Sequence, residues 1–237
     1  LNDQVPAHLR DADDRWTALS LRARIIAVSK ERVGREAITT LEDLATPKWR
    51  GRICTRKGSH VYNRAILASL IAHNGEDEAR NWTLGFIENL ARRPQGNDRA
   101  QAKAIYSGEC DIALMNTYYF GKMKFAQDKP EQQKWADAIE IAFFNQQDRG
   151  QHVNISAAGI TKGSKRKELA RAFLEWLTSE EAQRIYTEVN FEYPVNPAAE
   201  VSAEVASWGS FKMDLLPMNV IADTSPLAQR IIHETGW

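Results

Sequence analysis

The sequence predicts an α/β protein in which mostly parallel sheets are flanked by helices. Short apolar runs alternate with longer amphipathic segments along most of the 237 residues, which is the rhythm of βα units. Turn residues such as Gly58-Ser59 and Asn74-Gly75 separate the segments. A chain of this length forms either two compact lobes or one large α/β unit.

The individual elements follow from periodicity, capping residues and breakers. Strands are expected at residues 21–29, 52–55, 111–115, 138–144 and 153–160. Helices are expected at residues 40–49, 60–73, 76–92, 98–107, 165–177, 180–189 and 226–234, the first of them short and broken by Pro47. Gly58-Ser59 offers the turn and the N-cap for the helix at 60–73. A buried apolar stripe is expected on the helix at 165–177, made of Leu169, Phe173, Trp176 and Leu177.

Composition excludes several functional classes. The chain has 43% hydrophobic and 26% charged residues and a formal net charge of zero, so no overall positive field recruits nucleic acid. The longest apolar runs, such as that from Arg24 to Val28, are far shorter than a membrane span, and no membrane insertion is expected. The two cysteines, Cys54 and Cys110, form no CxxC motif. The sequence leaves open whether a disulfide joins them.

Two adjacent tyrosines, Tyr118 and Tyr119, follow the apolar run at residues 111–115. On a strand their side chains would point to opposite faces, whereas in the first turn of a helix they differ by about 100° and both reach one cleft. Asn116 and Thr117 are good capping residues, which favours the helical arrangement beyond the carboxyl end of the strand. Open α/β sheets bind ligands there. The alternative is that both rings pack in a core.

The run from Gly108 to Tyr119 resembles the GExDIAxxNxYY signature of bacterial periplasmic ferric-iron-binding proteins, the substrate receptors of iron ABC transporters. Further similarity extends over nearly the whole chain, in the segments 22–24, 41–52, 58–62, 93–98, 152–156 and 192–195. The resemblance implies a two-lobed, type II periplasmic-binding-protein-like fold. It also implies a periplasmic or secreted receptor, acting as a monomer, that hands its cargo to an iron ABC-transporter permease.

The resemblance carries over a set of site residues. The pair Tyr118 and Tyr119 and the upstream Tyr62 match the phenolate ligands of Fe³⁺. Arg22 and Arg24 match an arginine near the metal or its companion anion, such as carbonate, and Arg22 is the preferred candidate. The chemistry agrees, because a hard trivalent cation prefers anionic oxygen to thiolate. Each phenol must lose a proton to bind.

The resemblance also implies a division of the chain. Residues 1–25 form part of an N-terminal lobe and the first crossing, residues 26–150 form the C-terminal lobe with the tyrosines, and residues 151–237 cross back and add C-terminal wrapping helices. Family members carry strand and helix units ahead of the equivalent of Leu1, including an early ligand. An incomplete N-terminal lobe is therefore expected, with coordination positions left to water or anions.

Two other functions compete with iron capture. The first is a receptor for a small oxyanion such as phosphate or carbonate, held at helix amino termini near Ser59 and Asn116. The second is an α/β enzyme, which ranks last because GxSxG, HExxH and Gly-rich nucleotide motifs are missing. His60 and His152 are interpreted as hydrogen-bonded structural groups rather than metal ligands.

Overall fold

A mixed five-stranded sheet organises the computed structural model, which describes residues 3–237; the first two residues of the predicted N-terminal unit lie outside this range. Four strands follow the order β2-β3-β1-β4, and β5 pairs with another part of β1. The strands are β1 (Thr17–Ser29), β2 (Ile53–Cys54), β3 (Ile112–Asn116), β4 (Ile139–Ala142) and β5 (Val153–Ala158). The predicted α/β class is confirmed.

The strand directions differ from the prediction. β3, β4 and β5 all run antiparallel to β1, and β2–β3 is the one parallel pair among the named strands of residues 3–237. The expectation of mostly parallel sheets is therefore wrong. The parallel pair is connected by a helical crossover, as parallel strands require. β1 lies between β3 and β4 and runs the opposite way, which makes both of its neighbours antiparallel.

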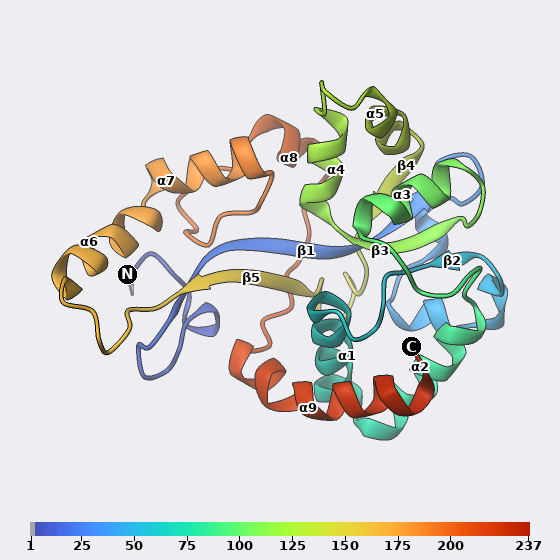
Figure 1. Cartoon of the computed structure of the whole chain (residues 1–237), viewed down its shortest axis with the longest axis horizontal. Helices are drawn as coiled ribbons and strands as arrows, with labels where there is room; N and C mark the ends of the chain where they lie inside the picture. Colours follow the sequence, from blue (N-terminus) through green and yellow to red (C-terminus); the bar gives the residue numbers. More distant parts are fainter. Residues whose placement is uncertain (1–2) are drawn as a thin grey trace.

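β1 changes partners along its length. Its first part, from Thr17 to Ala23, pairs with β5, whereas Ile26–Ser29 lies between β3 and β4. The long blue ribbon of β1 in Figure 1 thus connects the β5 region to the main body of the molecule. The division of the chain at residues 25 and 150 stays a prediction.

Two helical layers cover the main body of the sheet (Figure 1). Ile26 and Val28 face one apolar cluster and Ile25 and Ala27 face the other, because successive side chains of a strand alternate between its faces. The first cluster includes residues of α1 (Val61–Asn74), α2 (Glu76–Glu88) and α9 (Met218–Thr235). The second includes residues of α3 (Asp98–Tyr106), α4 (Thr117–Lys124) and α5 (Pro130–Asp137). Each fully buried aliphatic side chain contributes about 1.5–3 kcal/mol.

The remaining helical elements are short or lie away from this body. They are the 3₁₀ segments η1 (Ala7–Leu9), η2 (Arg35–Ala37), η3 (Glu42–Ala45) and η4 (Pro47–Trp49), the helices α6 (Lys167–Leu177), α7 (Glu180–Ile185) and α8 (Ala203–Ser207), and the π-helical turn η5 (Tyr186–Asn190). The helices predicted at 60–73, 76–92 and 98–107 coincide with α1, α2 and α3 to within a few residues.

Three element predictions are corrected. The helix expected at 40–49 is two 3₁₀ segments, because Thr46 is extended and Pro47 starts a new turn. The last helix begins at Met218, and Pro226 lies inside it. The stripe expected to be buried on α6 is exposed: Leu169 is 64%, Phe173 56% and Trp176 43% accessible. Helical periodicity identified one apolar face, but burial depends on what packs against that face.

A disulfide joins Cys54 at the end of β2 to Cys110 just before β3, with the two Cα atoms 5.9 Å apart. Cys54 lies opposite Ala113 in the parallel register of these strands, and Cys110 precedes a bend at Asp111 that leads into β3. The structure thus answers the question that the sequence left open. Over the described residues 3–237, no helix has the length and apolar character needed to cross a membrane.

Candidate metal centre

The three predicted tyrosine ligands lie together. The hydroxyl oxygens of Tyr62 and Tyr118 are 3.2 Å apart. The rings of Tyr118 and Tyr119 stack with their centroids 4.3 Å apart and 29° between their planes. All three side chains are partly exposed. The rings converge from two helices, although metal binding by them stays a prediction.

The sheet explains why these residues meet. β2 and β3 are parallel neighbours, so their carboxyl ends lie at the same edge of the sheet. The first helix after β2 begins at Val61, and the helix after β3 begins at Thr117. The tyrosines therefore occupy the opening turns of two helices that start at one edge. The helical arrangement predicted for Tyr118 and Tyr119 is confirmed.

The hydroxyl of Tyr118 holds its proton tightly. Burial raises the pKa of Tyr118, and the neighbouring phenols of Tyr119 and Tyr62 raise it further. Without a cation, the phenol is the stable form at neutral pH. A metal ion that binds this oxygen has to displace the proton, and its positive charge supplies the free energy for doing so.

Cationic side chains surround the tyrosines. The guanidinium carbons of Arg22, Arg24 and Arg56 lie 5.7, 5.6 and 5.2 Å from the centre of the Tyr62 ring. Arg99 lies 4.9 Å from the Tyr119 ring centre, and Lys122 lies 5.5 Å from that of Tyr118. Such positions are favourable for cation–π attraction.

The two arginine candidates have different roles in the structure. Arg24 is fully buried, and its guanidinium donates to Asp98 at 2.7 Å, to the side-chain oxygen of Asn63 at 2.7 Å and to that of Asn116 at 3.3 Å. Arg22 is only partly buried and donates to the carbonyl oxygen of Ile155. Arg24 therefore holds neighbouring elements together, and Arg22 is the freer of the two.

Several buried donors near Tyr62 have no partner among residues 3–237. They are the Nε atoms of Arg22, Arg24 and Arg56 and the side-chain Nδ2 of Asn116. Buried N–H groups are normally hydrogen-bonded. One carboxylate, Asp98, pairs with both Arg24 and Arg56. The three arginines beside Tyr62 thus keep an excess of positive charge over that carboxylate, which is suited to an anion.

The predicted capping residues are partly corrected. Ser59 is exposed and does not cap α1, because the residue at the N-cap is His60, whose Nδ1 accepts a hydrogen bond from the Tyr62 N–H at 3.3 Å. Asn116 is at the N-cap of α4, but its side chain makes no capping hydrogen bond and accepts instead from Arg24. The structural role predicted for His60 fits this geometry.

Sequence reasoning missed two residues of this centre and undervalued a third. Arg56 and Asn63 were not singled out, since a lone arginine or asparagine near a turn carries no pattern. Asp98 is the first residue of the helix predicted at 98–107, and the sequence did not show that it is fully buried between Arg24, Arg56 and the backbone N–H of Asn116. His152 is buried, but its ring Nε2 has no hydrogen-bond partner among residues 3–237, so the hydrogen-bonded role predicted for this side chain is wrong. Its backbone carbonyl accepts from the backbone N–H of Arg24 at 3.1 Å. Within the described part of the chain, no group of three or more His, Cys, Asp or Glu residues could hold a metal.

The geometry is that of a ligand site of an α/β protein, with side chains from the starts of α1 and α4 gathered at one edge of the sheet. Residues 1–213 match the family of bacterial extracellular solute-binding proteins, and the chain belongs to that family. It is 41% identical over 237 residues to "Iron uptake protein A1" of Synechocystis sp., covering all of this chain and 66% of that relative. The chain thus spans about two thirds of the relative's length.

Solved structures agree with this assignment. The fold matches a structure described as "Trichodesmium (IdiA) (FutA) in complex with iron and citrate ligands" with a TM-score of 0.97 and 42% identity, over 100% of this chain and 75% of that one. It matches the ferric binding protein from Campylobacter jejuni with a TM-score of 0.94 and 40% identity, over 100% and 75% of the two chains. The predicted family resemblance and periplasmic-binding-protein-like fold are confirmed.

Proposed function

We propose that this chain is a solute-binding receptor that captures Fe³⁺ with the phenolate oxygens of Tyr62, Tyr118 and Tyr119. The observation that carries the proposal is the 3.2 Å approach of the Tyr62 and Tyr118 hydroxyls, with the Tyr119 ring stacked on Tyr118. Hydroxyls at this distance share one hydrogen bond without a metal, and one cation between them replaces it.

The donor set suits a hard trivalent ion. Phenolates are anionic oxygen ligands, which hard cations prefer to thiolates. Three of them cancel the charge of Fe³⁺. The two cysteines are bonded to each other and offer no thiolate. Because the phenol of Tyr118 is protonated at neutral pH, iron capture by its oxygen releases a proton.

We further propose that a companion anion shares the ion. Three phenolates leave coordination positions open, and Arg22 and Arg56 lie on the Tyr62 side of the centre with buried Nε atoms that lack partners among the described residues. A carboxylate or carbonate group could bridge the ion and these donors. The related Trichodesmium structure, described as containing iron and citrate ligands, supports an anion of this kind.

The names of the relatives support a transport role over the alternatives. They are described as an iron uptake protein and a ferric binding protein, and another relative is described as an "Fe(3+)-binding periplasmic protein" of Serratia marcescens. We therefore favour ferric iron over an oxyanion as cargo, a periplasmic or secreted location and delivery to an ABC permease. The monomeric state stays a prediction. The same names favour transport rather than catalysis.

Visible absorption tests the proposal. Addition of ferric citrate to the 237-residue chain should produce an orange to red phenolate-to-iron charge-transfer band. Tyr118→Phe removes only the oxygen, and we expect it to keep the fold while losing most of the band and of the ferric affinity. Tyr62→Phe should behave in the same way.

Tyr106→Phe is the matched control, because Tyr106 is 49% exposed at the end of α3 and lies outside the centre. It should leave colour and affinity unchanged. Wild-type colour and affinity in a Tyr62→Phe/Tyr118→Phe/Tyr119→Phe variant would refute the ligand assignment. A colourless wild-type protein that binds phosphate or carbonate would favour the oxyanion receptor instead.

A further inference from the structure

β4 has a free edge. Lys30 donates its backbone N–H to the carbonyl of Ala138 at 3.1 Å, so these residues form a hydrogen-bonded pair of the antiparallel ladder. Because such pairs alternate with non-hydrogen-bonded ones, Ile139, Ile141 and Phe143 turn their N–H and C=O groups away from β1. Those groups point to the outer side of the last strand in the sheet order.

The other neighbour of β1 supports this alternation. Ser29 donates its backbone N–H to the carbonyl of Asp111, on the β3 side. Within Ile26–Ser29, odd-numbered residues of β1 therefore pair towards β3, and even-numbered residues pair towards β4. Across residues 3–237, no backbone group is hydrogen-bonded to the outward N–H and C=O groups of Ile141 and Phe143.

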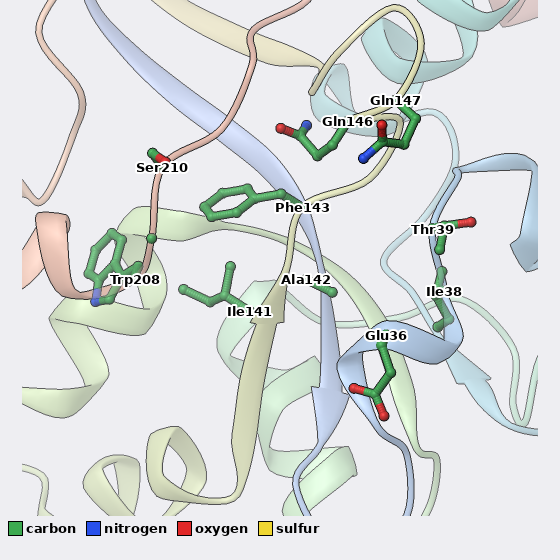
Figure 2. Close-up of a pocket in the computed structure, with 11 residues that line it drawn as sticks. Glu36, Ile38, Thr39, Ile141, Ala142, Phe143, Gln146, Gln147, Trp208 and Ser210 are labelled. Carbon is green, nitrogen blue, oxygen red and sulfur yellow. The ribbon is translucent and has the colours of Figure 1, made fainter.

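A cavity of about 370 Å³ follows this edge. Figure 2 shows Ile141 and Phe143 directed towards Trp208 and Ser210, whereas residues 36–39 lie on the side of Ala142. The groove therefore has a wall on each face of the strand, and the free edge forms its floor. Its volume is within the range of small-ligand sites.

The walls carry groups that suit a peptide. Gln147 is exposed, and its side-chain amide can donate and accept hydrogen bonds. Thr39 and Ser210 add hydroxyl groups, and Phe143 and Trp208 supply apolar surface. Glu36 is exposed at one side of the groove and places a carboxylate there.

We propose that this groove binds an extended peptide segment of a protein partner by β-strand addition to β4, with a basic residue of the segment facing Glu36. A strand that joins here would pair its backbone with the outward groups of Ile139, Ile141 and Phe143, as in other β-augmentation sites. Natural sheet edges are commonly blunted by short length, charged side chains, proline or a bulge. β4 contains no lysine or proline, but it has four residues and one charged side chain, Glu140, which limits the added strand to a short segment.

The walls favour a single strand over a second copy of the protein. Residues 36–39 and 208–210 flank the edge on its two faces, and a whole sheet with its helices would collide with them. None of the three tyrosines lines the groove. The inference is therefore independent of the proposed iron site.

Amide hydrogen exchange on the 237-residue chain tests the pairing at single residues. The probe is an acetylated pentapeptide of alternating threonine and valine with a central lysine. Without the peptide, the amides of Ile141 and Phe143 should exchange much faster than that of Ala142, which faces β1. With saturating peptide, exchange at Ile141 and Phe143 should slow at least tenfold.

Peptide variants separate β-pairing from other modes of binding. N-methylation at the residues whose N–H groups face β4 should abolish binding, and N-methylation at the alternate residues should leave it intact. Glu36→Lys should weaken the lysine peptide about tenfold and tighten a peptide with glutamate in its place. Glu31→Lys is the matched control, because Glu31 is exposed and lies outside the groove. This variant should bind both peptides with the wild-type affinity.

Three outcomes would overturn the proposal. The first is no saturable binding of either peptide. The second is binding that tolerates N-methylation at every position. The third is protection of Ile141 and Phe143 that appears without peptide and grows with protein concentration, which would assign the edge to a second copy of the chain.

Discussion

The guanidinium of Arg24 donates to the carboxylate of Asp98 at 2.7 Å, and both side chains are fully buried. Asp98 also accepts from Arg56 at 3.0 Å and from the backbone N–H of Asn116 at 2.8 Å. The carboxylate therefore connects β1, the start of α3 and the junction between β3 and α4. Tyr118 follows that junction by two residues, so this buried pair holds in place the backbone that positions the tyrosines.

The first prediction concerns this ion pair. Asp98→Asn keeps the side-chain shape but leaves the positive charge of buried Arg24 uncompensated. Removing one partner of a buried pair costs about 3–5 kcal/mol. The free energy of unfolding, measured in urea, should fall by that amount. Asp137→Asn, at an exposed aspartate, is the control; equal stabilities of the two variants would contradict the prediction.

The second prediction concerns the disulfide. Cys54 and Cys110 are 56 residues apart and enclose α1, α2 and α3. By the loop-entropy relation, their bond stabilises the fold by about 4 kcal/mol. A Cys54→Ala/Cys110→Ala variant should lose that amount in urea unfolding, and reductant should lower the stability of the wild type without affecting the variant. A reductant effect of the same size on both proteins would contradict this assignment.

The third prediction concerns acid stability. Burial lowers the pKa of His152 to about 4, and nearby Arg24, Arg149 and His73 oppose its protonation, while Asp214 favours it. The unfolded chain, with a histidine pKa near 6.5, binds this proton more readily than the folded state. The resulting stabilisation of about 3 kcal/mol is complete above pH 6.5 and is lost as the pH falls towards 4.

His152→Leu tests this linkage. The variant cannot take up the proton, so its unfolding free energy should fall less steeply than that of the wild type between pH 6.5 and 4. At pH 7 the two proteins differ only by packing, which makes that pH the internal control. A constant difference across the whole range would show that His152 does not take up a proton on unfolding there.

The fourth prediction concerns the pH dependence of iron capture. Below the pKa of tyrosine, every phenol that binds Fe³⁺ releases one proton. The logarithm of the ferric affinity should therefore rise by up to about three per pH unit in the wild type and by up to about two in Tyr118→Phe. Competition with citrate at several pH values, corrected for protonation of the competitor, measures the slope. Equal slopes for the two proteins would exclude Tyr118 as a proton-releasing ligand.

The local chemistry of this protein could be predicted from the sequence. Turn residues and apolar periodicity located α1, α2 and α3, because those signals act between neighbours in the chain. The side-by-side tyrosines and the segments that resemble ferric-binding proteins led to the family that the comparisons confirm. The prediction of mostly parallel strands was wrong, because periodicity in one strand contains no information about the direction of its neighbours.

Tertiary structure decided which residues, distant in the sequence, lie close together in the fold. The pairing of Cys54 with Cys110, the place of Tyr62 beside Tyr118 and the enclosure of Asp98 by two arginines all join residues more than 40 positions apart. Tertiary structure also decided that the apolar stripe of α6 is exposed, since periodicity defines such a stripe but not which elements pack against it. By itself the sequence determined which side chains are available for chemistry. Their convergence depends on the register and direction of strands, which are set by packing across the whole chain.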